Sequence, residues 1–242
     1  MKISVCFSGH LRTFRKCLPY YKNLFRAHEV KYFMHSWSET SPFESSWHGY
    51  DLKPKKVSEK DIYFLKTNLK DIEFIFENQL EIINELDIQK YEIREKVYRL
   101  INYSQSISID LALNNNCSDL IISSRPDIKF CNKKLSEFIN KLDLERFYVL
   151  GNSNNSSNLS DYSACDAVNI SNPDNFKKKI IYFKNNLINF SSSSQRNGWE
   201  YQQFMNDSRI QVDILPLVFN KDWKIKRPSF SLIRDLTQRL YE

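Results

Sequence analysis

The segment that decides the fold is Asp119-Leu-Ile-Ile-Ser-Ser-Arg-Pro-Asp-Ile-Lys-Phe130. Its apolar run, Leu120 to Ile122, is short and rich in β-branched residues, which is typical of a strand buried on both faces of a sheet. Pro126 cannot donate to a sheet ladder and favours an extended conformation at Arg125, so the strand ends there. The segment therefore presents a cation, Arg125, and a carboxylate, Asp127, at a strand's carboxyl end, where open α/β sheets bind ligands.

The amino-terminal sequence predicts a second and a third strand whose carboxyl ends meet the first. Residues 2–7 are apolar on both faces, and apolar residues then recur at helical spacing over 12–26, with Pro19 as a candidate kink. Residues 30–34 form the next strand-like run. Strand, helix and strand in this order predict a right-handed βαβ unit.

Polar and aromatic residues follow both of these strands. Gly9 suits a tight strand-to-helix turn, and free N–H groups at the start of the helix favour an anion. Trp37 could stack on a base or sugar ring, or serve as a core aromatic. The alternative for the turn after the first strand is a helix cap. No Gly-X-Gly-X-X-Gly pattern or P-loop is present. We predict a nucleotide-binding set formed by Ser8, Gly9, His10, Arg12, His35 and Trp37.

The remaining sequence predicts one α/β domain over residues 1–242. Residues 61–87 and 91–115 have helical patterns, so we expect a helical insertion at 60–116. Further helices are expected at 134–142 and 174–187, and strands at 146–150, 167–170 and 210–217. Residues 220–242 form a basic and aromatic tail that could dock on the protein or on a membrane surface.

Composition narrows the functional classes. The 242 residues are 41% hydrophobic and carry a net charge of +6, spread along the chain without a compact basic block, which argues against nucleic acid as a partner. The five cysteines are odd in number and match no zinc spacing, as expected for reduced thiols of a cytoplasmic protein. The sequence contains no run of eighteen apolar residues, and we expect neither a signal peptide nor a membrane-spanning segment.

Three carboxylates are candidates for the chemistry. Asp127 could bind a divalent metal that holds a diphosphate, or could pair with Arg125, which could itself clamp a phosphate. The motif is Arg-Pro-Asp and not Asp-X-Asp, so metal dependence does not follow. Asp166 suits a general base or a turn cap. Glu200 lies at the start of a predicted helix. It could act as a base, or its carboxylate could simply be stabilised there by the helix dipole.

An ordered set of short motifs resembles one group of proteins. The set runs from Ser8-Gly-His-Leu-Arg-Thr-Phe14 through Phe33-Met-His-Ser-Trp37 and Tyr103-Ser-Gln-Ser-Ile107 to the segment around Arg125, and ends with Cys165-Asp-Ala-Val168 and Trp199-Glu200. It is similar to the bacterial glycosyltransferase-like proteins of capsule and lipopolysaccharide synthesis, the WavE-like group.

The resemblance implies a GT-A-like fold with a mostly parallel central sheet flanked by helices, and transfer of a sugar from a nucleotide-sugar donor to a glycan or glycolipid acceptor at the bacterial surface. It places the enzyme in the cytoplasm or peripherally at the inner membrane. Two cofactor alternatives stay open: Mn²⁺ or Mg²⁺ at Asp127, or a mechanism without a metal. Other open functions are a non-catalytic nucleotide- or carbohydrate-binding subunit of a capsule assembly complex, and transfer of a non-sugar group.

Overall fold

The structure is a computed structural model of the whole chain. It describes residues 1–11, 13–39, 56–91, 93–115, 118–150, 167–186, 204, 208–217 and 221–225. Predictions that concern Arg12, Asp166, Glu200 and most of the carboxyl-terminal tail lie outside these residues.

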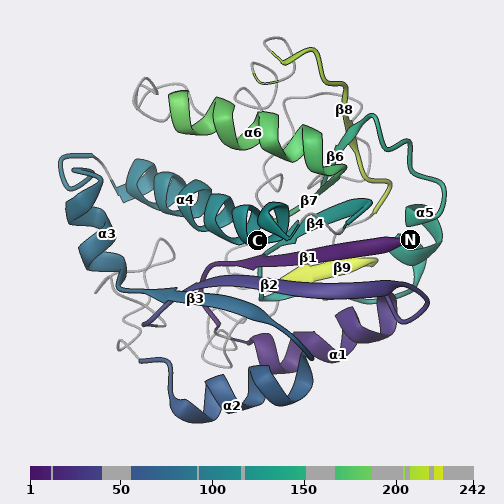
Figure 1. Cartoon of the computed structure of the whole chain (residues 1–242), viewed down its shortest axis with the longest axis horizontal. Coiled ribbons are helices and arrows are strands. Elements are labelled where there is room, and N and C mark those ends of the chain that lie inside the picture. Colours follow the sequence, from purple (N-terminus) through teal and green to yellow (C-terminus); the bar gives the residue numbers. More distant parts are fainter. Residues whose placement is uncertain are drawn as a thin grey trace, which may run out of the picture.

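A seven-stranded, mostly parallel sheet forms the centre of the molecule (Figure 1). Its strand order is β3-β2-β1-β4-β7-β6-β8. Of the paired neighbours, only β7 runs antiparallel to β4 and β6. The strands are β1 (Lys2–Ser8), β2 (Glu29–Trp37), β3 (Glu73–Glu77), β4 (Leu120–Ser124), β6 (Phe147–Val149), β7 (Val168–Ser171) and β8 (Val212–Ile214).

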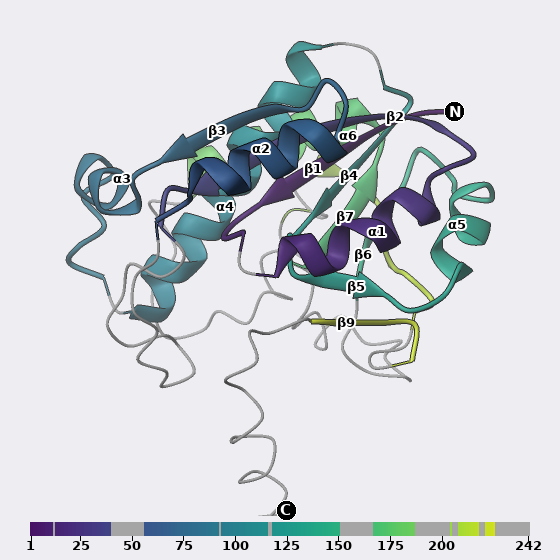
Figure 2. The ribbon, with the colours of Figure 1, turned by 90° about the horizontal axis from the view of Figure 1, so that it is seen from below.

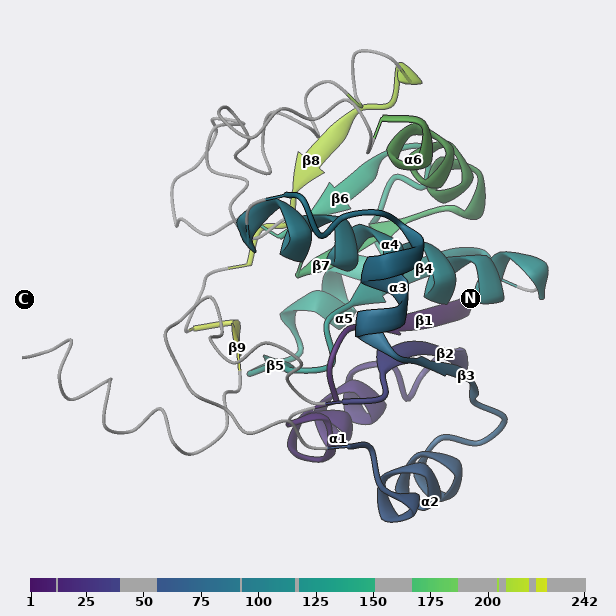
Figure 3. The ribbon, with the colours of Figure 1, turned by 90° about the vertical axis from the view of Figure 1, so that its left-hand side faces the viewer.

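Helices cover both faces of this sheet. Helices α1 and α2 lie on one face and α4 and α6 on the other, as Figures 1 and 3 show. The described helices are α1 (Phe14–Leu24), α2 (Glu59–Asn68), α3 (Gln79–Glu85), α4 (Ile93–Asn114), α5 (Lys134–Ile139) and α6 (Pro173–Asn186). None of them is long and apolar enough to cross a bilayer.

The strands alternate their side chains between two apolar cores. Val5 and Phe7 of β1 point to the α1 side, whereas Cys6 points to the side of α4 and α6. All six residues from Ile3 to Ser8 are buried, which is why the strand sequence is apolar on both faces. The predicted β1–α1–β2 unit is confirmed, and α1 continues through Pro19, which lies on its exposed side.

The expected helical insertion differs from the structure in one element. Residues 73–77 form the edge strand β3, which pairs in parallel with β2. They were expected to be helical because charged residues flank a run of only three apolar ones, Phe74 to Phe76, between two helical patterns. In addition, α4 packs against β1 and β2, so this long helix belongs to the layer that covers the sheet.

A two-stranded antiparallel ribbon lies beside the sheet. Strand β5 (Ile128–Phe130) continues from the Arg-Pro-Asp motif and pairs with β9 (Trp223–Ile225). The carboxylate of Asp222 is buried and accepts hydrogen bonds from Asn132 Nδ2 at 2.7 Å and Lys134 Nζ at 3.1 Å. The start of the expected tail is therefore a strand of the folded protein.

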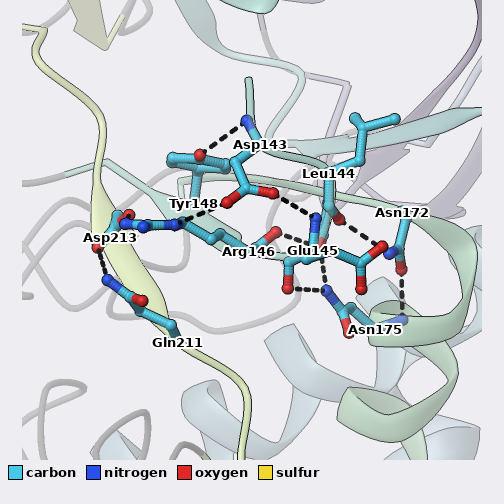
Figure 4. A network of polar contacts seen from close by, with 10 residues as sticks. Asp143, Leu144, Glu145, Arg146, Tyr148, Asn172, Asn175, Gln211 and Asp213 are labelled. Carbon is cyan, nitrogen blue, oxygen red and sulfur yellow. Dashed lines mark hydrogen bonds and ion pairs between the residues drawn. The ribbon is translucent and has the colours of Figure 1, made fainter. Parts of the chain in front are cut away.

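A network of polar contacts lies at the edge of the sheet that ends in β8 (Figure 4). Arg146 precedes β6 and donates to Asp143 at 3.0 Å and to Asp213 of β8 at 2.8 Å. These two carboxylates raise the pKa of Arg146. At the start of α6, Asn175 donates to the carbonyl of Glu145 at 3.1 Å. This network fixes β8 and α6 to the chain that enters β6.

Candidate functional site

The predicted residues at the ends of β1, β2 and β4 lie on one edge of the sheet. In the parallel registers, Ser8 is opposite His35 and Phe7 is opposite Ser124. Because these strands run in the same direction, their carboxyl ends open on the same side, and the turns after them share that edge. The structure thus brings the Ser8-Gly9-His10 turn and the Arg125-Pro126-Asp127 motif to neighbouring strands.

Gly9 makes the turn after β1 possible. Its φ of +107° is a conformation that other residues rarely adopt. Its N–H donates to the carbonyl of His35 at 3.2 Å, which extends the pairing of β1 with β2 by one residue. A Cβ atom placed on Gly9 would meet no atom within 4 Å. The backbone here therefore requires glycine for its conformation and not for lack of space.

His10 ties the same turn to the chain that follows β2. Its Nδ1 donates to the carbonyl of Glu39 at 2.7 Å. Glu39 in turn makes an isolated antiparallel bridge with Lys56. The side chain of His10 is thus directed by the backbone beyond β2, and the segment after β1 is held at a defined position at the edge.

The Arg-Pro-Asp motif forms a closed ion pair. Arg125 donates from Nε and Nη2 to the two carboxylate oxygens of Asp127, at 3.0 and 2.8 Å. The side chain of Asp127 is 6% exposed and that of Arg125 is 30% exposed, so the cation is the more accessible partner. The Arg125 N–H also donates to the carbonyl of Ala167 at 3.0 Å, which anchors the motif to the residue before β7.

Tyr21 of α1 contacts the chain directly before this motif. Its hydroxyl shares a hydrogen bond of 2.5 Å with Ser124, the last residue of β4. Ring contacts with Phe7 and Phe130 pack the phenol into the core. Burial raises the pKa of Tyr21 well above its ordinary value, so the phenol stays neutral. Helix α1 therefore fixes the end of β4 through a buried hydroxyl pair.

His35 and Trp37 lie behind the edge, between β2 and α4. His35 Nδ1 is 2.7 Å from the hydroxyl of Ser104, and its Nε2 is 2.8 Å from Glu77. The ring of Trp37 stacks on Tyr103 with centroids 6.1 Å apart. Both predicted residues are buried, and their strand alternation points them to α4. Their contact with a nucleotide stays a prediction.

A buried polar layer lies deeper on the same face, and the sequence pattern did not assign it to the site. Lys179 of α6 is 3% exposed and donates to Asn169 of β7 at 2.6 Å and to Gln105 of α4 at 3.0 Å. Asn169 is opposite Ser123 of β4 in the sheet register. The signal in the sequence was the set of polar residues that α4 buries, among them Gln105 and Ser108.

The described residues do not fit a divalent metal well. Both oxygens of Asp127 already accept from Arg125, so a cation would have to share or displace a guanidinium. Among the residues that the structure describes, no group of three His, Cys, Asp or Glu side chains is arranged to hold a metal ion. What this part of the edge offers a ligand is the partly exposed cation of Arg125.

The strand order, the parallel core with one antiparallel strand and the helices on both faces define a GT-A-like fold, as the sequence predicted. An active-site mutant of LgtC matches with a TM-score of 0.50 and 11% identity, over 88% of this chain and 72% of that chain.

Two further solved structures are similar at lower scores. The galactosyltransferase LgtC in complex with donor and acceptor sugar analogs matches with a TM-score of 0.49 and 11% identity, over 88% of this chain and 73% of that chain. A putative glucose-1-phosphate thymidylyltransferase from Bacillus anthracis, in complex with a sucrose, matches with a TM-score of 0.48 and 9% identity, over 98% and 95% of the two chains. No protein-family model matches the sequence, and neither does any curated protein.

Proposed function

We propose that the protein is a glycosyltransferase that moves a sugar from a nucleotide-sugar donor to a glycan or glycolipid acceptor of the bacterial surface. The observation that carries this proposal is the position of Arg125. A partly exposed guanidinium lies at the carboxyl end of β4, on the strand next to the Gly9 turn, in a GT-A-like sheet. This is the edge at which open α/β sheets bind nucleotides.

In this proposal Arg125 neutralises the donor diphosphate. A guanidinium suits the task because it is permanently charged and offers paired N–H donors to phosphate oxygens. Asp127 holds the guanidinium by two hydrogen bonds, so that the cation is oriented before the donor arrives. The side chain of Arg12 supplies further donors, because the Gly9 N–H and His10 Nδ1 already donate to the carbonyls of His35 and Glu39.

The proposed reaction exchanges one bond at the anomeric carbon. The bond to the donor's phosphate oxygen breaks, and a bond to an acceptor hydroxyl oxygen forms. The nucleoside diphosphate leaves with the bonding electron pair, and the hydroxyl proton passes to a carboxylate base. We assign the base to Asp166 or Glu200, the two carboxylates that the sequence offers for this role.

We propose that the guanidinium takes the role that Mn²⁺ or Mg²⁺ would have. The two-point contact between Arg125 and Asp127 supports this, because it gives the carboxylate a cation without a metal. A metal ion bound at Asp127 is the competing assignment. Donor binding measured with EDTA and with Mn²⁺ separates the two.

The test is a thermal-shift screen with uridine, cytidine and guanosine diphosphate sugars, each with EDTA and with Mn²⁺. We expect at least one donor to raise the Tm in EDTA, and the Arg125→Met variant to lose that shift while it keeps its far-UV circular dichroism. The positive donor is then incubated with acceptor glycans and the product identified by mass spectrometry. The donor assignment fails if no nucleotide sugar shifts the Tm under either condition.

A further inference from the structure

Helices α1 and α2 form a surface that has no part in the candidate site. They lie side by side across one face of the sheet, and Figure 2 looks onto this face. A groove of about 460 Å³ runs between them. Its floor includes Leu18, Pro19 and Phe64, and its rim carries Arg15, Lys22 and Arg26. The groove is thus apolar inside and cationic at its margin.

The charged side chains that line the groove are all cationic. Helix α1 contains no acidic residue, and its exposed positions include Arg15, Lys16 and Lys22. At the start of α2, Asp61 forms an ion pair with Arg15 at 2.8 Å and also caps its own helix. Of the cations that line the groove, Arg15 is thus paired with a carboxylate.

Lys22 and Arg26 also line the groove. Both are exposed, and neither forms an ion pair with a residue that the structure describes. A surface with cations and without carboxylates attracts an anionic partner.

Two exposed aromatic side chains accompany these cations. Tyr63 of α2 is 72% exposed and Tyr20 of α1 is 38% exposed. The ammonium of Lys129 lies 4.0 Å from the centre of the Tyr20 ring, which adds a further cation beside α1. Tyrosine favours the interface between lipid and water because its ring is apolar and its hydroxyl is polar.

We infer that the face formed by α1 and α2 docks on an anionic lipid bilayer. Lipid phosphates would meet Lys22 and Arg26, glycerol and acyl segments would cover the apolar floor around Leu18 and Phe64, and the two tyrosines would lie at the interfacial level. Apolar floor, cationic rim and exposed tyrosines together match an amphiphile. A nucleic acid would meet the cations but would leave the apolar floor without a partner.

This docking sets the orientation of the protein. Helix α1 begins at Phe14, a few residues after the Gly9 turn, so the edge that carries Arg125 lies beside the bilayer and not on the far side of the molecule. Helices α4 and α6 then face away from the lipid. The inference is independent of sugar transfer, because vesicle binding is measured without any donor or acceptor.

The test is flotation of the full chain with vesicles of phosphatidylcholine, with and without phosphatidylglycerol. We expect binding only to the anionic vesicles, and less of it as salt is raised. Each basic residue near an anionic surface strengthens binding roughly fivefold. The double variant K22E/R26E should therefore bind at least about tenfold more weakly, and Tyr63→Ser should weaken binding at every salt concentration.

The matched control is K177E/K178E. Lys177 and Lys178 are exposed on α6, on the opposite face. Because both double variants replace two cations by two glutamates, they have the same net charge. It should keep at least half of the wild-type binding. Circular dichroism and Tm establish that each variant is folded, and K22Q/R26Q replaces K22E/R26E if the charge reversal unfolds the protein.

The inference is overturned by wild-type protein that does not bind anionic vesicles, by equal loss of binding in the two double variants, or by no loss of binding in K22E/R26E. It is also overturned if Lys22 and Arg26 are needed for binding double-stranded DNA or an acidic protein while vesicles are not bound.

Discussion

The hydroxyl groups of Tyr21 and Ser124 join helix α1 to the last residue of β4 at a distance of 2.5 Å. Both side chains are buried, and each hydroxyl also lies within reach of the Arg125 carbonyl, at 3.4 Å from Tyr21 and 3.3 Å from Ser124. The next residue, Arg125, begins the motif at the candidate site. A contact inside the core thus controls where the strand ends and the site begins.

Tyr21→Phe should lower the free energy of unfolding by about 1–2 kcal/mol, because it leaves the Ser124 hydroxyl with a poorer partner. Urea denaturation measures this loss. Tyr20→Phe is the control on the same helix, since Tyr20 is exposed, and it should change stability by less than about 0.5 kcal/mol. In a cycle with Ser124→Ala, strictly additive losses would show that the two hydroxyls do not interact.

Asp127→Asn should reduce donor affinity without abolishing the fold. The amide offers one acceptor oxygen where the carboxylate offers two, so Arg125 loses one of its two hydrogen bonds and its orientation. We expect about a tenfold rise in the Kd of the positive nucleotide sugar, measured by calorimetry. Arg125→Lys should show a similar rise, because an ammonium cannot form the paired contact.

The two assignments of Asp127 predict opposite effects of metal removal on donor affinity. If Arg125 neutralises the diphosphate, the donor Kd stays within about twofold after EDTA treatment. A donor that binds only with Mn²⁺ present, with affinity lost in Asp127→Asn, would contradict the assignment to the guanidinium. Calorimetry with and without Mn²⁺ makes the comparison directly.

His35 should titrate below its ordinary pKa of about 6.5. Burial lowers the pKa, and the hydrogen bond to Glu77 opposes that shift. Above pH 6.5 the ring is neutral in both states and its contribution to stability is complete. As the pH falls below about 6.5, the unfolded chain takes up a proton first, so stability is lost until the folded pKa is reached.

Glu77→Gln should lower the pKa of His35 further, because it removes the negative charge that favours the imidazolium. A titration of the ring carbon signals by NMR measures this. His28, whose pKa is also lowered by burial, provides an internal reference that the change should leave in place. A rise in the His35 pKa would show that Glu77 does not act on it as described.

Lys179→Met should destabilise the protein by about 2–3 kcal/mol. The replacement keeps the aliphatic part between the rings of Phe147 and Phe183, each about 5.6 Å from the ammonium, but removes the donor for Asn169 and Gln105. Lys178→Met, at the exposed neighbouring position, should change stability by less than about 0.5 kcal/mol. Two equal denaturation curves would contradict a structural role for the ammonium.

Buried strands were the part of the fold that local sequence could predict. Residues 2–8 and 120–124 are apolar on both faces, and a short run of this kind is typical of a strand in the middle of a covered parallel sheet. Strand β3 was missed because an edge strand of five residues carries only a short apolar run. Strand β9 was missed because its partner, β5, is far away in the sequence, and pairing over such a separation leaves no local pattern.

The candidate site was predictable in position more than in contacts. Strand ends locate Gly9 and Arg125 at one edge, and parallel pairing makes this a consequence of topology. The pair between Arg125 and Asp127 was one of two alternatives, and side-chain geometry was needed to choose it. That His35 would meet Ser104 and Glu77 depends on where α4 and β3 pack, which a linear pattern does not contain.

The ribbon of β5 and β9 has a consequence for synthesis of the protein. Ile128 pairs with Ile225, so the strand that follows the Arg-Pro-Asp motif does not meet this partner until the ribosome has passed residue 225. Until then β5 lacks the hydrogen bonds to β9, and Lys134 lacks Asp222. Translation order thus delays pairing of the strand that follows the candidate site, and a chain that stops before β9 leaves β5 without this partner next to Asp127.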